Sequence, residues 1–179
     1  TCALQHDRYR NKSQMPAEMQ NGILKTGFYA YNSHRIIDIS DCRLSPSVFS
    51  VITDIIKKWA HDTALPDGIL RHIYLRQSYA GKNVCVCLVT SCDTLPFSES
   101  LIKELSELKE VSGIVLNVNK ADTNVILGNT IKTLYGTQYL TDVINGTLFR
   151  ISPLSFYQVN PSCVQLLYEK AAELSDLKS

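Results

Sequence analysis

The chain has 179 residues, of which 45% are hydrophobic and 20% are charged, so it can form one ordinary globular domain. The formal net charge of +1 excludes attraction of nucleic acid by overall charge, so contact with RNA or DNA would require a local basic patch. No apolar run approaches the roughly 18 to 20 residues of a membrane span, and no signal peptide is visible. We therefore expect a cytoplasmic protein with no membrane partner.

The six cysteines do not form a recognisable disulfide or metal framework. Cys85 and Cys87 alternate in an apolar run, which favours packing in the core over a ligand role. Cys42 follows a turn and could hold a ligand, whereas Cys2 lies in a polar terminal stretch. Because no complete CxxC pair is present, spacing alone does not predict a closed metal site.

The first half of the chain predicts strands that alternate with one amphipathic helix. Two strands at 24–30 and 35–39 form a predicted hairpin, and Ser45-Pro46 begins a helix with apolar residues at helical spacing. A strand at 70–77 follows, in which we expect Arg71, Tyr74 and Arg76 among the exposed side chains. The next strand, 84–90, is apolar throughout and is therefore predicted to be buried.

The second half predicts another helix after Pro96 and then short strands. Their expected ranges are 111–118, 124–127, 130–134, 139–144 and 147–151, the last two joined by the hairpin signal Asn145-Gly146. Asn160 and Pro161 form a helix start, followed by a helix that is predicted to bury Val164 and Leu167. The order predicts an α+β fold with a mixed or antiparallel sheet and helices packed on it.

Catalytic signatures are absent from this sequence, but basic and amide residues gather in several segments. No glycine-rich phosphate loop, HExxH motif or nucleophile elbow is present. Residues 9–14 combine an aromatic, two cations and two amides, and residues 33–35 and 70–73 add polar, basic segments. Cations can bind phosphates, an aromatic ring can stack on a base, and amides can read its edge. A solvated terminal segment explains residues 9–14 equally well, so the residues alone indicate only an α+β domain.

Several blocks of the sequence nevertheless resemble, in order, the central domain of RNA uracil-5-methyltransferases. The blocks lie at residues 9–14, 27–30, 33–38, 41–42, 70–73, 113–119, 123–128 and 152–161. The resemblance implies a parent enzyme that transfers a methyl group from S-adenosylmethionine to C5 of a uridine in ribosomal or transfer RNA. In the family a Cys first adds to C6 of the base, because C5 of uracil is otherwise a poor nucleophile.

The resemblance also implies roles for individual residues. Arg10 and Lys12 match a basic strand that faces RNA, and Gln158 matches an amide that borders the cofactor and the target uridine. Phe156 matches the aromatic residue that helps to hold the flipped base. Cys42 matches one ligand of the family's 4Fe-4S cluster, and Cys2 resembles, more weakly, the last Cys of the segment that supplies the others.

The sequence departs from the family pattern in ways that predict a fragment. The S-adenosylmethionine loop, the catalytic Cys and the base Glu are missing, so we expect no catalytic residue here and an inactive chain in isolation. With at most two of four thiolates, no stable iron–sulfur cluster is expected. Residues 1–151 would form the central RNA-facing domain, and 152–179 the start of a truncated Rossmann-like methyltransferase domain whose remainder is the expected partner.

Two alternative functions remain open from the sequence. The chain could be a standalone RNA-binding module without catalytic activity, or a metal or iron–sulfur protein. Under the enzyme hypothesis, the blocks typical of cluster-bearing members favour ribosomal over transfer RNA as the substrate. They do not identify the uridine.

Overall fold

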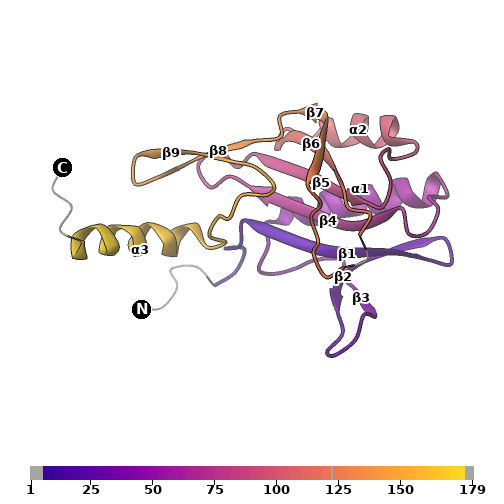
Figure 1. Ribbon diagram of the computed structural model, residues 1–179, viewed down its shortest axis with the longest axis horizontal. Coiled ribbons are helices and arrows are strands. Elements are labelled where there is room, and N and C mark those ends of the chain that lie inside the picture. The colour runs from indigo at the N-terminus through magenta and orange to yellow at the C-terminus, as the bar shows by residue number, and fades with distance from the viewer. Residues whose placement is uncertain (1–5, 122, 176–179) are drawn as a thin grey trace.

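The computed structural model of the protein describes residues 6–121 and 123–175, which form a large sheet with helices on one face (Figure 1). Among these residues, none of the helices is long and apolar enough to cross a membrane. In chain order the elements are β1 (Lys12–Gln20), β2 (Ile23–Tyr29), β3 (Ile36–Asp38), α1 (Ser47–Asp62), β4 (Leu70–Gln77), β5 (Val84–Thr90), α2 (Ser98–Ser106), β6 (Val111–Val118), β7 (Thr130–Gly136), β8 (Leu140–Ile144), β9 (Thr147–Ile151) and α3 (Pro161–Leu174).

The main sheet has seven strands in the order β3-β2-β1-β4-β5-β6-β7. Only β5 and β6 run parallel, because α2 connects them as a crossover, while the other neighbours pair antiparallel. Strands β8 and β9 form a separate hairpin. The predicted α+β class with a mixed sheet and helices packed on it is therefore confirmed.

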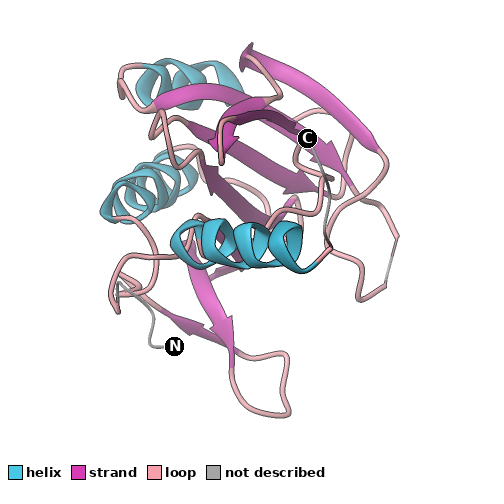
Figure 2. Ribbon diagram, turned by 90° about the vertical axis from the view of Figure 1, so that its left-hand side faces the viewer, coloured by secondary structure: helices cyan, strands magenta, loops and turns pink. Residues whose placement is uncertain are grey.

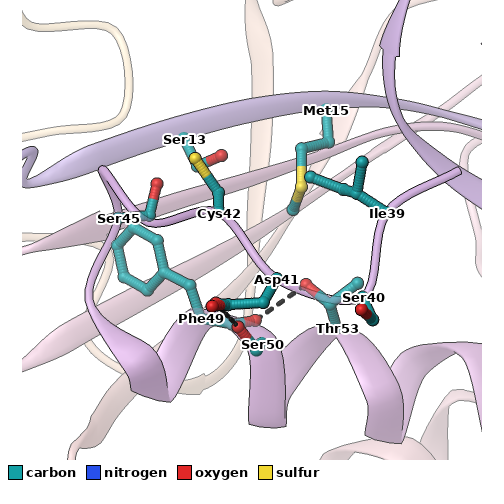
Figure 3. Close-up of a pocket in the computed structure, with 10 residues that line it drawn as sticks. All are labelled: Ser13, Met15, Ile39, Ser40, Asp41, Cys42, Ser45, Phe49, Ser50 and Thr53. Atoms are coloured by element: carbon teal, nitrogen blue, oxygen red, sulfur yellow. Dashed lines mark hydrogen bonds between the residues drawn. The ribbon is translucent and has the colours of Figure 1, made fainter. Parts of the chain in front are cut away.

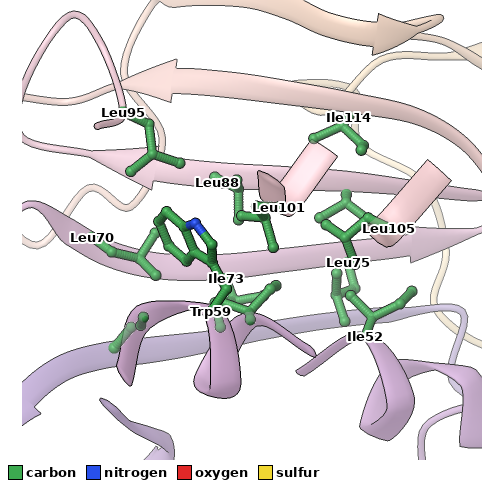
Figure 4. Close-up of a cluster of buried hydrophobic side chains, with 14 of the residues drawn as sticks. Ile52, Trp59, Leu70, Ile73, Leu75, Leu88, Leu95, Leu101, Leu105 and Ile114 are labelled. Atoms are coloured by element: carbon green, nitrogen blue, oxygen red, sulfur yellow. The ribbon is translucent and has the colours of Figure 1, made fainter. Parts of the chain in front are cut away.

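The larger hydrophobic core lies between the main sheet and helices α1 and α2 (Figure 4). Ile73 and Leu75 of β4 alternate inward and are completely buried, as is Ile52 of α1. The Trp59 indole also reaches this core, and its Nε1 donates a hydrogen bond to the Phe97 carbonyl 3.0 Å away. This layer holds the central strands rigidly, which fixes the side chains that β4 presents on its other face.

A second hydrophobic cluster covers part of the opposite face of the sheet. Cys85 and Cys87 contribute to it from β5, as the alternation predicts, and the β8–β9 hairpin and Val164 of α3 pack on it. Figure 1 shows α3 extending from the end of the molecule opposite to α1 and α2, and Figure 2 views the molecule from that end, with α3 in front. Both Val164 and Leu167 were predicted to be buried. Val164 faces the cluster and is 1% exposed, whereas Leu167 does not belong to the cluster and is 55% exposed.

The expected exposure of β4 was wrong for two of its three residues. Tyr74 and Arg76 are only 2% and 3% exposed, and Arg71 is half-buried. Tyr74 and Arg76 do lie on the face away from the helices, opposite to Ile73 and Leu75, as the alternation requires. That face is covered by the second cluster and by the segment that follows β9, so it is not a solvent face.

Two further elements differ from the sequence-based expectations. Strand β1 begins at Lys12 and lies between β2 and β4; the hydrophobic pattern did not predict it, although the family resemblance implied a basic strand at Arg10 and Lys12. Residues 124–127 form a loop instead of a strand. The side-chain amide of Asn119 donates to the carbonyls of Val125 and Ile126, so these groups are bonded to a side chain and not to a neighbouring strand.

Replacing Leu88 with Ala is expected to lower the free energy of unfolding by about 2–5 kcal/mol, because Leu88 is 0% exposed in a central strand and its loss leaves a cavity. Ile37→Ala on the edge strand β3 is the matched control, since Ile37 is 46% exposed and should cost less than about 1 kcal/mol. Urea unfolding measures both changes. Equal losses for the two variants would contradict this placement of the core.

Candidate functional site

The segment from Ser152 to Asn160 connects β9 to α3 and carries two of the predicted site residues, Phe156 and Gln158. At its end, the Asn160 side chain accepts a hydrogen bond from the Cys163 amide at 3.2 Å, and Pro161 begins α3. The predicted helix start is therefore confirmed. Because a capped helix fixes the direction of the chain entering it, one end of this connecting segment is held in place.

A buried arginine holds the beginning of the connecting segment. The Arg76 guanidinium donates to the carbonyls of Ser152 and Ser155 at 3.1 and 3.0 Å. Its carbon lies 5.4 Å from the centroid of the Tyr74 ring. Burial lowers the pKa of Arg76 from its ordinary value, and the Tyr74 hydroxyl partly offsets this decrease by raising it. Arg76 therefore ties the sheet to the connecting segment through backbone carbonyls.

A second anchor is Asn11, just before β1. The backbone N–H of Asn11 donates to the Val159 carbonyl at 3.0 Å. The side-chain Nδ2 of Asn11 donates to the Gln158 carbonyl, also at 3.0 Å. Asn11 is 5% exposed, so these bonds form in a largely dry environment. The backbone of Gln158 is thus held, while its half-buried side chain is not needed for either bond.

The third anchor is the buried carboxylate of Asp142 on β8, which is 1% exposed. It accepts hydrogen bonds from the Tyr157 hydroxyl at 2.9 Å and from the Tyr79 and Ala80 amides at 2.7 and 2.9 Å. Burial, followed by the contact with Asp142, raises the pKa of Tyr157 above its ordinary value. The phenol therefore remains a proton donor at neutral pH, and Asp142 joins the connecting segment to the turn between β4 and β5.

These anchors give Phe156 and Tyr157 opposite environments. Tyr157 is 9% exposed and packs in the second cluster, whereas the neighbouring Phe156 is 86% exposed. An exposed aromatic ring on a segment held at three points can offer a flat apolar surface to a planar ligand such as a base. Gln158, two residues along, offers a side-chain amide with both donor and acceptor capacity.

Arg10 and Lys12 flank Asn11, so both predicted RNA-facing cations lie next to the connecting segment. Arg10 is exposed and Lys12 is half-buried, with its Nζ 6.0 Å from the Tyr74 ring centroid. Burial, and then the charges of Arg76 and Arg10, lower the pKa of Lys12. Among the described residues, no carboxylate forms an ion pair with Arg10, Lys12 or Arg76. The arrangement can therefore accept an anion.

The other basic segments do not join this site. Ser33, His34 and Arg35 lie in the turn between β2 and β3, which projects away from α3 in Figure 1. Arg71 donates to the carbonyls of Asn119 and Ala121 and so supports the loop after β6. Of the predicted nucleic-acid segments, only residues 9–14 adjoin the connecting segment.

Cys42 lines a small cavity between β1 and α1 (Figure 3). The neighbouring Asp41 accepts hydrogen bonds from Arg8 and Ser50, which hold its pKa well below the ordinary value. Cys2, the other predicted ligand, lies outside the described residues. Within the described parts of the chain, no group of three or more His, Cys, Asp or Glu side chains could hold a metal ion. The described residues therefore do not form an iron–sulfur site by themselves, and the ligand roles of Cys42 and Cys2 stay predictions.

Sequence reasoning missed the anchors Asn11, Arg76 and Asp142 as site residues. A signal was present for Asp142, because it stands between Leu140 and Ile144 at an inward position of β8, where an acid is unusual. Asn11 and Arg76 bond to backbone carbonyls more than 70 residues away in sequence, and no local pattern identifies such partners.

Tyr157→Phe is expected to lower the free energy of unfolding by about 1–2 kcal/mol, because it removes a buried hydrogen bond and leaves Asp142 with one donor fewer. Tyr168→Phe on α3 is the control, since Tyr168 is 42% exposed and should change stability little. Thermal or urea unfolding measures both. If the two variants are equally stable, the hydroxyl does not anchor the segment.

Acid should destabilise the protein in part through His72. Burial, and then Arg71, lower the pKa of His72 to about 4, and its Nδ1 has no partner among the described residues. The unfolded chain, with a His pKa near 6.5, binds more protons in this range. The His72 contribution is therefore complete above about pH 6.5 and is lost as the pH falls towards 4.

The measurement is the free energy of unfolding between pH 7 and pH 4.5 for the wild type and for His72→Gln. As the pH falls, the free energy of unfolding should decrease less in His72→Gln than in the wild type. His61→Gln serves as the control, because His61 lies exposed near the end of α1. A wild-type pH dependence that matches the His72→Gln variant would contradict the burial of a neutral imidazole.

Comparison with known proteins shows what the chain is similar to. No protein-family model matches it. It is 40% identical over 177 residues to an uncharacterized RNA methyltransferase of Listeria monocytogenes serotype 4b (strain F2365), a match that covers 95% of this chain and 39% of that protein. An uncharacterized RNA methyltransferase of Clostridium tetani (strain Massachusetts / E88) is also 40% identical, over 179 residues, with 96% and 39% coverage.

The fold is shared with a solved structure. The crystal structure of Pyrococcus abyssi tRNA (uracil-54, C5)-methyltransferase in complex with S-adenosyl-L-homocysteine matches with a TM-score of 0.80 and 21% identity. That match covers 96% of this chain and 42% of the other. The curated relatives bear out the predicted similarity to RNA methyltransferases, and the chain spans 39% of the length of the bacterial proteins it matches.

Proposed function

We propose that the chain is part of an RNA methyltransferase that transfers a methyl group from S-adenosylmethionine to C5 of a uridine. The observation that carries the proposal is the anchored connecting segment, which presents Phe156 at 86% exposure two residues before Gln158. The relatives are named RNA methyltransferases, and the structural neighbour is named for uracil C5 and was solved with S-adenosyl-L-homocysteine. The shared fold and this exposed aromatic–amide pair support the same chemistry here.

The described residues would bind and orient substrates, and none of them is assigned to bond making. Phe156 would stack on the base that leaves the RNA helix, and Gln158 would hydrogen-bond at the border between base and cofactor. Arg10 and Lys12 would contact RNA phosphates without reading sequence. S-adenosylmethionine would supply the methyl group, with Gln158 as the residue of this chain that borders it.

We also propose that residues 152–179 belong to a Rossmann-like methyltransferase domain, with α3 as its first helix, and that residues 1–151 form the central domain. The exposed apolar side chains of α3 support this division. Leu166, Leu167 and Leu174 are 49%, 55% and 75% exposed, so α3 has an apolar face available for the rest of such a domain. The partner of this face would be the catalytic domain of the same polypeptide.

The RNA substrate is proposed from two observations that point in different directions. The sequence blocks favour ribosomal RNA, whereas the structural neighbour is named for transfer RNA. Ribosomal RNA is the substrate we propose, and an assay on both unmodified RNAs separates the two. A purely RNA-binding module is the second candidate, favoured by the cations beside Phe156 and by the lack of an assigned nucleophile among the described residues.

Transfer of labelled methyl groups from S-adenosylmethionine to unmodified RNA tests the proposal. The chain alone should transfer none, whereas a polypeptide extended to the full length of the relatives should be active. In that polypeptide, Gln158→Ala should reduce methyl transfer at least tenfold, because the lost amide borders both substrates. Gln138→Ala, in the turn before β8, is the matched control and should retain full activity.

Three results would contradict the proposal in distinguishable ways. Methyl transfer by the chain alone would overturn the assignment of catalysis to residues outside it. RNA binding without methyl transfer by the extended polypeptide would favour the binding module. Full activity of Gln158→Ala would remove the role proposed for this amide.

A further inference from the structure

A recess beside the connecting segment is lined by four parts of the chain that are distant in sequence. Its walls are residues 8–11, Pro46 before α1, residues 77–79 with Lys82 from the turn between β4 and β5, and Pro161 and Ser162 at the start of α3. Asn11 belongs to the wall and also donates to the Gln158 carbonyl. The recess is therefore attached to the segment that presents Phe156.

Two of the cations in the recess are free of carboxylate partners. Arg8 is occupied, because it forms an ion pair with Asp41 at 2.6 Å. Arg10 and Lys82, in contrast, form no ion pair within the described residues. Glu110 borders a neighbouring hollow that Lys82 also lines, but it is not bonded to Lys82. Positive charge is thus gathered here without a protein anion to neutralise it.

The Lys82 ammonium is held near the recess by an aromatic ring. Its Nζ lies 4.5 Å from the centroid of Tyr79, which lines the same recess. A cation–π contact leaves the ammonium protons available, so Lys82 can still bind an anion. The first turn of α3 adds a smaller positive field, because the amides at a helix start point outward.

We propose that this recess binds a backbone phosphate of the RNA, at a nucleotide next to the base that Phe156 contacts. This proposal rests on the proposed function. Arg10 would provide directed hydrogen bonds to the phosphate oxygens, and Lys82 a compact point charge. Because Asn11 is shared by the recess and the Gln158 anchor, a phosphate held here fixes the RNA backbone relative to the base-facing side chains.

The backbone at Lys82 permits a clean test. Its φ of 55° lies in the left-handed region, where glycine is more favourable than lysine. Lys82→Gly removes the charge and should leave the thermal unfolding midpoint unchanged or raised. Arg10→Gln removes the second cation at an exposed position. Lys103→Ala on the exposed side of α2 is the control for loss of one positive charge.

The measurement is fluorescence anisotropy of a labelled, uridine-rich 12-nucleotide single-stranded RNA titrated with the chain at several salt concentrations. Lys82→Gly and Arg10→Gln should each weaken binding by about threefold to tenfold and reduce the slope of log K against log salt by about 0.7. Lys103→Ala should change neither. A parallel titration with inorganic phosphate, followed by the amide resonance of Lys82, shows whether the recess takes a free anion.

Each outcome has one consequence. RNA binding that is unaffected by both recess variants overturns the phosphate proposal and leaves the proposed function intact. Failure of the wild-type chain to bind the RNA also overturns the phosphate proposal, whereas the proposed function is decided separately by methyl transfer in the extended polypeptide. If inorganic phosphate shifts the Lys82 resonance while the variants bind RNA normally, the recess is a small-anion site and the RNA proposal is wrong.

Discussion

The buried carboxylate of Asp142 is the contact on which the site depends. It is 1% exposed and accepts from one side-chain hydroxyl and two backbone amides of other segments. A carboxylate removed from water is stable only if its oxygens are bonded, so the three donors must be placed around it when the chain folds. Asp142 thereby fixes the β8–β9 hairpin, the turn after β4 and the connecting segment relative to one another.

Arg76 completes this arrangement from the sheet. A buried guanidinium also needs partners, and it finds them in the carbonyls of Ser152 and Ser155, the first of which also accepts from the Ser155 amide within the segment. The hydrophobic layer beneath α1 and α2 is what keeps β4 rigid enough to hold Arg76 there. Packing on one face of the sheet therefore supports the polar connecting segment on the other, with Phe156 left open to solvent.

The elements that the sequence predicts well are those with a strong local pattern. The β5 strand, helix α1, the Asn145-Gly146 hairpin and the Asn160-Pro161 helix start each have their own apolar spacing or turn chemistry. Strand β1 lacks that pattern, since Lys12 and Gln14 stand on a face that is only partly covered. The exposure of Tyr74 and Arg76 was mispredicted because the segment that covers them follows more than 70 residues later.

The chain shares its fold with a methyltransferase, and the anchoring of its connecting segment by Asp142 can be measured directly. The Tyr79 and Ala80 amides lie on an exposed turn, where without an acceptor they would exchange rapidly with solvent. Native-state hydrogen exchange followed by NMR should show strong protection of both amides. The Lys82 amide, in the same turn and with no acceptor among the described residues, should exchange fast. Equal, rapid exchange of all three amides would contradict the Asp142 anchor.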